Sequence, residues 1–248
     1  MMVLQPLYDG TMKDFLGSEQ LTEWDTRVGL MKDIANGLNA LHALSTEIKF
    51  SNGSHAKLKM FHMDLKPSNI LVRRQNGQLT AAITDFGMAG SYTKRGGSLG
   101  YKAPEEARLE QRGNLTDTMV EEHNTLYGQA MNVWALGLLF MDLAVNKPLT
   151  FLDNQKPTVF TQLPCIHECI FNAQGTNSFV LQPSLDNKKY DIFLASLEQK
   201  QVDLSINKIR AQESLTGFQP GQANVWDLIL LMLRVNPEER MFVKNITL

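Results

Sequence analysis

The sequence predicts a mainly α-helical fold that contains one small β-hairpin and is built as a single unit. Apolar residues recur at three- and four-residue steps over a long early segment, and two later segments are apolar almost all round. An Asn-Gly pair separates two short apolar runs between them. No repeat, low-complexity tract or Pro/Ser-rich linker divides the 248 residues, so we expect one unit over the whole chain.

The first long helix is predicted from Thr22 to about Leu44, with Thr22 as its N-cap. Its apolar positions fall on one stripe: Trp24, Val28, Met31, Ile34, Leu38 and Leu41. The next stretch, Ser45 to Lys59, loses this period and gathers small polar residues with three lysines. It is predicted to be an exposed loop, and the alternative that its lysines form a docking patch remains open.

The hairpin is predicted between Ile70 and Ile83, because Asn76-Gly77 supplies the positive backbone angles that a tight turn needs. Two buried helices follow, at Trp134 to Val145 and at Val225 to Val235, since both segments are apolar on nearly all sides. Between them, Lys147 to Pro220 shows almost no clean period. We expect short helices and long loops there.

The composition is that of a folded globular protein, with 43% hydrophobic and 20% charged residues. A formal charge of -2 gives no electrostatic reason to expect nucleic acid or a membrane surface as a partner. Two cysteines are too few for a disulfide scaffold. There is no signal-like start and no apolar run judged long enough to span a bilayer, so a cytoplasmic protein is predicted.

Three short motifs carry residues suited to phosphoryl transfer. They are His62-Met63-Asp64-Leu65-Lys66-Pro67-Ser68-Asn69-Ile70-Leu71, Asp85-Phe86-Gly87 and Gly97-Ser98-Leu99-Gly100-Tyr101-Lys102-Ala103-Pro104-Glu105. An aspartate can orient a hydroxyl and accept its proton, and a lysine two residues later can contact the transferred phosphoryl group. An asparagine and a second aspartate supply the hard oxygen ligands that Mg²⁺ prefers. The hairpin predicted between the first two motifs would bring these groups together.

The motifs resemble the catalytic loop, the metal-binding turn and the end of the activation segment of eukaryotic-type serine/threonine protein kinases. The resemblance implies that Asp64 is the catalytic base, that Lys66 contacts phosphate, and that Asn69 and Asp85 bind magnesium. It also implies ATP and Mg²⁺ as cofactors and a protein as substrate. Lys66 is typical of the serine/threonine subclass, and Ser98 matches a hydroxyl that bonds toward Asp64 and Lys66 in it.

The resemblance covers the chain as a hinge over residues 1–10 and a large helical lobe over residues 11–248. It places Leu7 in the hinge and Leu71 beneath the adenine of ATP. The family's Gly-x-Gly-x-x-Gly loop is absent, because no two of the 17 glycines are separated by a single residue. The strand lysine and its glutamate partner have no counterpart either. We therefore expect the β-rich small lobe to be missing, so that a partner or a further segment would have to supply it.

Other positions are assigned by the same resemblance. His62 is expected to brace the loop by packing, and Glu105 and Arg240 are expected to form a buried ion pair. Two positions depart from the family pattern. Met63 replaces the arginine that would pair with a phosphorylated activation segment. Asn132 replaces the aspartate expected at the start of the helix before Trp134, which predicts a less rigid catalytic loop.

Two functions of different class remain open. The first is a serine/threonine protein kinase present as an incomplete domain, and the second is a catalytically inactive, kinase-like binding module. A small-molecule phosphotransferase shares part of the first motif, but the second and third motifs argue against it. The triplet Cys165-x-His167-x-Cys169 has too few ligands for a structural zinc site and is interpreted as reduced thiols.

Overall fold

The computed structural model describes residues 7–50, 52–90, 98, 100–111, 117–147, 194–214 and 221–248. Its helices are α1 (Met12–Phe15), α2 (Trp24–Ala43), α3 (Pro104–Gln111), α4 (Asp117–Val145), α7 (Gln199–Ser214) and α8 (Gln222–Met232). Its strands are β1 (Gly10–Thr11), β2 (Ser45–Lys49), β3 (His55–Lys59), β4 (Ile70–Gln75) and β5 (Gln78–Ile83). Helices outweigh strands in these ranges, which confirms the mainly α prediction.

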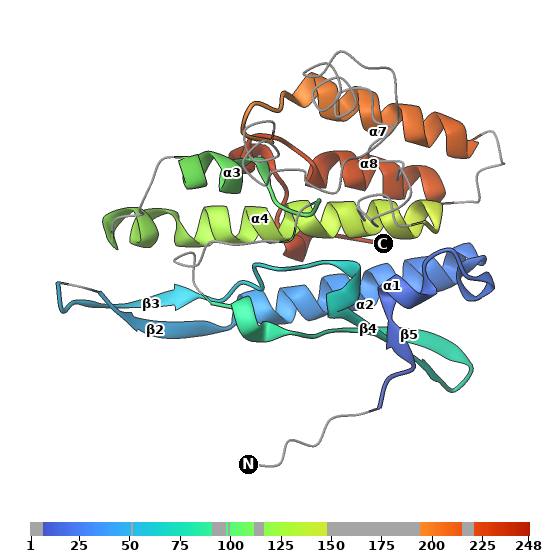
Figure 1. Ribbon diagram of the computed structural model, residues 1–248, viewed down its shortest axis with the longest axis horizontal. Helices are drawn as coiled ribbons and strands as arrows, with labels where there is room; N and C mark the ends of the chain where they lie inside the picture. Colours follow the sequence, from blue (N-terminus) through green and yellow to red (C-terminus); the bar gives the residue numbers. More distant parts are fainter. Residues whose placement is uncertain are drawn as a thin grey trace, which may run out of the picture.

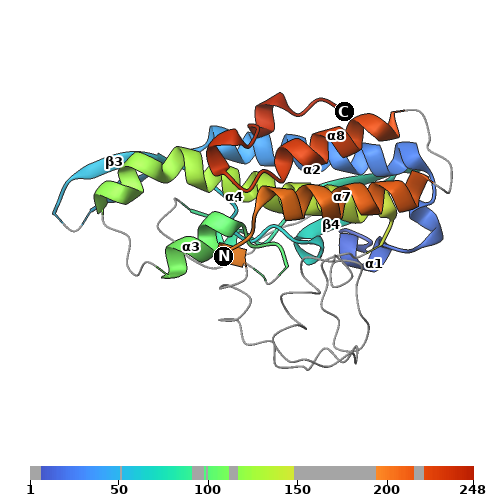
Figure 2. The ribbon, with the colours of Figure 1, turned by 90° about the horizontal axis from the view of Figure 1, so that it is seen from above.

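Helix α4 is the central element of the fold (Figure 1). It packs against α2 on one side and against α8 on the other, and α7 packs on α8 farther out (Figures 1 and 2). The segment Leu126–Val145 is long and apolar enough to cross a membrane, but 94% of its most hydropathic window is buried inside the structure. Such burial is what a core helix shows, and it explains why α4 is apolar on nearly every side.

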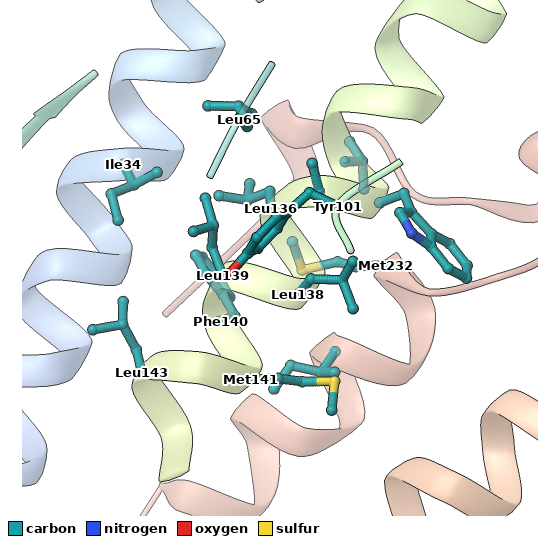
Figure 3. Packing of buried hydrophobic residues seen from close by; sticks show 14 of the residues in the cluster. Ile34, Leu65, Tyr101, Leu136, Leu138, Leu139, Phe140, Met141, Leu143 and Met232 are labelled. Atoms are coloured by element: carbon teal, nitrogen blue, oxygen red, sulfur yellow. The ribbon is translucent and has the colours of Figure 1, made fainter. Parts of the chain in front are cut away.

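The core forms where three helices and the loop that precedes β4 meet. Figure 3 shows Leu136, Leu139 and Leu143 of α4 among Ile34 of α2 and the other labelled members of the cluster, Leu65, Tyr101, Leu138, Phe140, Met141 and Met232. All of these side chains are buried. Because Leu65 and Tyr101 belong to this cluster, the loop segments that carry the sequence motifs are anchored in the core.

Helix α4 begins well before the predicted start at Trp134, at Asp117. The prediction followed the apolar run and missed the earlier turns, in which hydrophobicity is lower. Asn132 consequently lies inside the helix, not at its start. Gly128 in these earlier turns is required by packing, because a Cβ atom there would collide with the ring of Phe61.

The predicted β4–β5 hairpin is confirmed. Its turn is Asn76-Gly77, with φ of 52° and 83°, and its register pairs Ile70 with Ile83. Strand β1, which the sequence did not predict, adds to the other edge of β4 through Gly10 opposite Val72. The resulting three-stranded sheet leads directly from the first motif to the second.

The prediction of a loop over Ser45–Lys59 was wrong. Strands β2 and β3 pair there as a second antiparallel hairpin, which projects beyond the helices (Figure 1). Its tip holds Gly53 at φ 85°, and the backbone N–H and the hydroxyl of Ser54 both donate to Oδ1 of Asn52. Phe50 and Leu58 form a small cluster of their own. The small polar residues that predicted a loop therefore form the turn of a hairpin.

Helices α2 and α8 confirm the two remaining predicted helices with small shifts at their ends. Thr22 is not the N-cap of α2, because Glu23 occupies that position and the Thr22 hydroxyl donates to the carbonyl of Glu19. Helix α7 is longer than the short helices predicted for its region. Its buried positions Val202, Ser205, Ile206 and Ile209 follow the helical period. Cys165, His167 and Cys169 lie outside the described residues.

Candidate active site

The carboxylate of Asp64 is at the centre of a hydrogen-bonded cluster. The Lys66 ammonium donates to its Oδ2 at 2.7 Å, and the Asn69 amide donates to the same oxygen at 3.2 Å. The other oxygen, Oδ1, accepts from the hydroxyl of Ser98 at 2.8 Å and from its backbone N–H at 3.1 Å. The Lys66 ammonium also donates to the Ser98 hydroxyl at 2.6 Å. These four residues, predicted from the first and third motifs, are therefore in direct contact.

The cluster determines the charge of Asp64. Burial alone would raise the pKa of this carboxyl, but hydrogen bonds from Lys66 and Ser98, together with the Lys66 charge, outweigh burial and lower the pKa below its usual value. Asp64 is therefore ionised at neutral pH. An ionised carboxylate beside an ammonium can orient a hydroxyl and accept its proton.

Thr84 places Asp85 beside the loop that carries Asn69. The backbone N–H of Thr84 donates to the Asn69 carbonyl at 2.9 Å, and the Thr84 carbonyl accepts from Nε2 of His62 at 2.8 Å. Asp85 follows at the end of β5 in the left-handed region, with φ 61°, and its Oδ1 accepts from the N–H of Gly87. The side chain of Asp85 is exposed. It is thus held at the site by its backbone and remains accessible.

His62 braces the loop, as predicted. Its side chain is completely buried, and its Nδ1 accepts from the N–H of Asp64 at 3.3 Å while Nε2 donates to Thr84. Burial lowers the pKa of His62, which keeps the ring neutral. A neutral ring with one donor and one acceptor nitrogen is what these two bonds require. The ring also lies near that of Phe86, with centroids 5.3 Å apart.

The two positions that depart from the family pattern are in contact with each other. The Asn132 amide donates to the thioether sulfur of Met63 at 3.9 Å, and its oxygen accepts from the N–H of His62 at 2.8 Å. The same oxygen lies 3.3 Å from Nε2 of His42 in α2. Met63 is buried and has φ 66°. The side chain at the arginine position therefore points into the protein.

The predicted ion pair between Glu105 and Arg240 is confirmed. The two side chains form a bidentate pair, with Nη2 of Arg240 donating to Oε2 of Glu105 at 3.0 Å and Nη1 donating to Oε1. Both residues are buried. Arg240 also donates to the carbonyls of Ala130 and Arg234. The pair joins the end of the third motif to α4 and to the segment after α8.

A family model described as "Protein kinase domain" matches residues 1–247. The chain belongs to the protein kinase family. Members of this family generally use ATP and Mg²⁺ and act on protein substrates. The order of the motifs, the Asp64 cluster and the buried Glu105–Arg240 pair all agree with this membership.

Several curated protein kinases are similar to the chain. Cyclin-dependent kinase 2 of Caenorhabditis elegans is 28% identical over 75% of this chain and 43% of its own length. Dual specificity testis-specific protein kinase 1 of Rattus norvegicus is 31% identical over 56% of this chain and 19% of its own length. A putative leucine-rich repeat receptor-like serine/threonine-protein kinase of Arabidopsis thaliana is 26% identical over 60% and 15%. The matches thus span less than half of each of these kinases.

Two residues predicted to contact the nucleotide, Leu71 and Leu7, have no described contact with the Asp64 cluster. Leu71 lies in β4, half-buried and opposite Thr11 of β1. Leu7 precedes β1 and is 92% exposed, and no described contact joins it to the Asp64 cluster. Residues 1–10 were predicted to be a hinge, and that role stays a prediction. The structure describes this segment from Leu7 onward, and the N–H of Asp9 donates there to the Val72 carbonyl.

The oxygen donors of the site fit the magnesium ion that the family uses. Among the described residues, no three His, Cys, Asp or Glu side chains gather as a metal cluster. The site instead offers the exposed Asp85 carboxylate and the nearby Asn69 side chain. Mg²⁺ characteristically takes one or two protein oxygens and completes its shell with water and phosphate, so this sparse donor set suits it. Asn69 and Asp85 would hold the ion.

The sequence assigned no role to three residues that position this kinase site. Thr84 acts through its backbone, which no side-chain motif records. His42 lies in the helix predicted from Thr22 to Leu44, next to its apolar stripe, and makes a polar contact with Asn132. Tyr101 donates from its hydroxyl to the buried Asp142 of α4 at 2.7 Å, which fixes the segment after Ser98. Tyr101 stands in the third motif, but its partner Asp142 can be identified only in the folded chain.

Proposed function

We propose that the chain is the catalytic part of a serine/threonine protein kinase, which transfers the γ-phosphoryl group of Mg-ATP to a serine or threonine hydroxyl of a protein. The observation that carries this proposal is the cluster of Asp64, Lys66, Asn69 and Ser98 around one ionised carboxylate. A buried ion pair could be purely structural. Here, however, Lys66 and Asp64 keep part of their surface accessible, next to an exposed Asp85.

Each residue has a distinct role in this proposal. Asp64 orients the acceptor hydroxyl and accepts its proton, since its pKa lies below the usual value and it is ionised at neutral pH. Lys66 is already held against Asp64 and places a positive charge beside the path of the phosphoryl group. Asn69 and Asp85 hold magnesium. The ion, when bound, neutralises charge that develops on the phosphate oxygens.

The preference for serine and threonine rests on Lys66 and Ser98. The Ser98 hydroxyl bonds to both Asp64 and Lys66, which is the arrangement that the resemblance to serine/threonine kinases implies for these three residues. The named relatives include serine/threonine and dual specificity kinases, and those descriptions belong to the relatives. We extend to this chain only the preference that its own Lys66–Ser98 contact supports.

The other half of the nucleotide site would come from a partner chain or from a further segment. Two large apolar side chains on the expected nucleotide side are exposed: Leu7 at 92% and Phe86 at 51%. The chain also lacks the glycine-rich sequence that covers phosphates in this family. Phosphoryl transfer depends mainly on positioning and electrostatic stabilisation, so the 248-residue chain by itself should turn over slowly.

A catalytically inactive binding module is the second candidate. It is favoured by Met63 and Asn132, which replace charged residues of the family pattern, and by the absent glycine-rich sequence. The complete set of Asp64, Lys66, Asn69 and Asp85 favours a kinase, because a binding role alone places no demand on all four. The two candidates differ in a direct measurement of phosphoryl transfer.

The deciding experiment measures transfer from γ-labelled ATP to a general protein acceptor, myelin basic protein, with magnesium present. The chain is tested alone and fused behind a kinase small lobe, and the labelled amino acid is identified. We expect slow transfer by the chain, faster transfer by the fusion, and label on serine or threonine. Asp64→Asn and Asp85→Asn should abolish transfer, while Asp25→Asn, an exposed change in α2, should not. Transfer that survives both site variants would overturn the proposal.

A further inference from the structure

The β2–β3 hairpin carries its charged side chains on one face. In an antiparallel pair, directly opposite residues point to the same side, and successive residues of a strand alternate between sides. The register therefore gathers six residues on one face: Ser45, Glu47, Lys49, His55, Lys57 and Lys59. The other face carries Leu58, which is buried together with Phe50. We propose that the six-residue face, here named the basic face, docks an acidic, extended segment of the protein substrate, an inference that rests on the proposed kinase function.

The lysines of the basic face differ in their accessibility to a partner. Lys49 and Lys57 are exposed. Lys59, at the base of the hairpin, is half-buried, and its ammonium donates to the last backbone carbonyl of α2 at 3.5 Å. Glu47 is the acidic member of the face; it lies opposite Lys57, and its carboxylate is 3.3 Å from Nδ1 of His55. Lys49 and Lys57 are therefore the main docking charges, and Glu47 opposes them.

The charge of the hairpin differs in sign from that of the rest of the chain. Residues 45–59 contain three lysines and one glutamate, a net charge of +2. The whole chain has 24 basic and 26 acidic residues, so the 21 basic and 25 acidic residues outside the hairpin give -4. An acidic segment is thus attracted to the hairpin and repelled by the average charge elsewhere. Such complementarity selects the partner and its position more than it adds affinity.

The chemistry of the basic face favours carboxylates on a peptide. Lys57 and Lys59 are two residues apart on one strand, which separates their Cα atoms by about 6.5 Å, and alternate residues of an extended peptide repeat at the same interval. Recognition of phosphates favours arginine, and residues 45–59 contain none. Docking to an anionic membrane characteristically takes about four to eight basic residues, more than the three lysines present. A protein segment is therefore the partner that fits.

The hairpin leads directly into the catalytic loop. Lys59 precedes Asp64 by five residues, so their Cα atoms lie within about 18 Å of each other. Phe61, between them, exchanges two backbone hydrogen bonds with Gly90, of 2.8 and 2.9 Å, which hold this connection. Strand β3 lies against α4, and the hairpin extends with the start of α4 toward the same end of the molecule (Figures 1 and 2). A substrate segment held there raises the local concentration of a linked acceptor hydroxyl near Asp64.

Docking is tested first as binding to the 248-residue chain without nucleotide. The probe is a fluorescein-labelled peptide of about eight residues in which glutamate and alanine alternate, and its anisotropy is measured at low salt, where surface charges are least screened. Changing Lys49 and Lys57 together to glutamate should weaken binding about tenfold. The matched control, Lys200→Glu with Lys208→Glu, reverses two exposed lysines of α7 and should change binding less than about twofold.

Two further variants keep this test independent of damage to the hairpin. Glu47→Gln removes the opposing carboxylate and should tighten binding about twofold, a gain that a misfolded hairpin cannot produce. Lys49→Gln with Lys57→Gln places no new carboxylate opposite Glu47 and should weaken binding about threefold. The basic face is refuted as a docking site by absent binding or by equal binding to the reversed chain. Tighter binding of labelled oligo-dT or of phosphatidylserine vesicles would overturn the peptide as partner.

The substrate role is tested on the active fusion described above. Two peptides share an acceptor serine and a glycine linker of about ten residues, whose average span of about 17 Å matches the reach from the hairpin to Asp64. One ends in the glutamate–alanine repeat and the other in a glutamine–alanine repeat. The acidic peptide should have a KM about fivefold lower at unchanged kcat, and the Lys49→Glu, Lys57→Glu fusion should lose this advantage.

The two tests separate failure of the docking inference from failure of the proposed function. Equal KM values for the two peptides would overturn the docking of substrate, while transfer by the fusion would still support a kinase. If the fusion transfers nothing to either peptide, the proposed function fails. The anisotropy measurement then still decides whether the basic face binds an acidic segment.

Discussion

Nε2 of His62 lies 2.8 Å from the backbone carbonyl oxygen of Thr84 and ties the first motif to the end of β5. The N–H of the same Thr84 donates to the carbonyl of Asn69, so the residue is held by the loop from both of its backbone groups. Asp85 is the next residue. These main-chain contacts of Thr84 do not involve the Asp85 side chain, so Asp85→Asn tests the carboxylate with the backbone contacts kept.

Arg240→Ala should destabilise the fold strongly. The change removes the bidentate partner of a buried carboxylate, Glu105, and the stranded charge is expected to cost about 3–5 kcal/mol of unfolding free energy. Lys57→Ala on the exposed hairpin is the control and should cost less than about 0.5 kcal/mol. Urea unfolding measures both. Similar losses in the two variants would contradict a structural role for the pair.

Gly128→Ala should also be destabilising, through sterics alone. The added methyl group would collide with the Phe61 ring, which is buried in the core. We expect a loss of about 1–3 kcal/mol, visible in thermal unfolding. Combining the change with Phe61→Leu should recover part of the loss, whereas Gly29→Ala, where a Cβ meets nothing, should be neutral or stabilising. No recovery in the double variant would argue against the collision.

Stability should fall as pH falls from about 6.5 to 4, in part because of His42. Burial lowers the pKa of His42 from 6.5 to about 4, so in this window the unfolded chain binds a proton that the folded chain excludes. Stability is fully present above pH 6.5, and the loss at pH 4 attributable to this one residue is roughly 3 kcal/mol. The slope of unfolding free energy against pH gives the number of protons that the chain takes up on unfolding. In His42→Gln this number should be smaller by up to one. An unchanged slope there, or an equal change in His55→Gln on the hairpin, would refute the assignment.

Ser98→Ala should shift the acid limb of the activity profile to higher pH. Burial raises the pKa of Asp64 and the hydrogen bonds from Lys66 and Ser98 lower it, so removal of the Ser98 hydroxyl moves the pKa of Asp64 upward. The carboxylate would then be protonated at higher pH and lose its role as a base sooner on acidification. A kcat/KM profile of the active fusion measures the shift, with Ser45→Ala as control. An acid limb that moves the other way would show that another group titrates there.

Phosphomimetic changes at Ser91, Tyr92 or Thr93 should alter activity by less than about twofold. These residues lie outside the described part of the chain, but the position from which an arginine would reach a phosphate holds Met63, whose side chain is buried against Asn132. Transfer rates of single and triple glutamate variants of the fusion measure the effect. Strong activation would mean that another basic residue has taken the missing arginine's place.

Local signals predicted much of the fold. Asn76-Gly77 indicated one hairpin because its turn requires positive φ at both residues, and the stripe of α2 was complete enough to give its length. The β2–β3 hairpin was missed because Phe50 and Leu58, the buried hydrophobic residues that the structure describes there, come together only after the strands pair. The early turns of α4 were missed because they are less hydrophobic than the apolar run that begins near Trp134.

The sequence predicted individual residues of the site, but it did not predict the contacts between them. Asp64, Lys66 and Asn69 followed from a single motif, and Ser98 from the resemblance to the serine/threonine subclass. The contact between Met63 and Asn132 could not be derived in this way, because the two departures lie 69 residues apart and the sequence does not record that they touch. The sequence therefore predicted a less rigid catalytic loop. In the structure, the Asn132 side chain contacts that loop through both its amide oxygen and its amide nitrogen.

The separation between Glu105 and Arg240 has a consequence for the order of events during synthesis. The two partners are 135 residues apart, and a ribosome adds about 5–20 residues per second, so Glu105 waits on the order of ten seconds for its guanidinium to be made. During that interval the carboxylate must stay hydrated, and the site it will occupy must stay open. The junction of α3, α4 and the segment after α8 can therefore close only once that segment has been synthesised, and until then its buried surfaces stay exposed on the nascent chain.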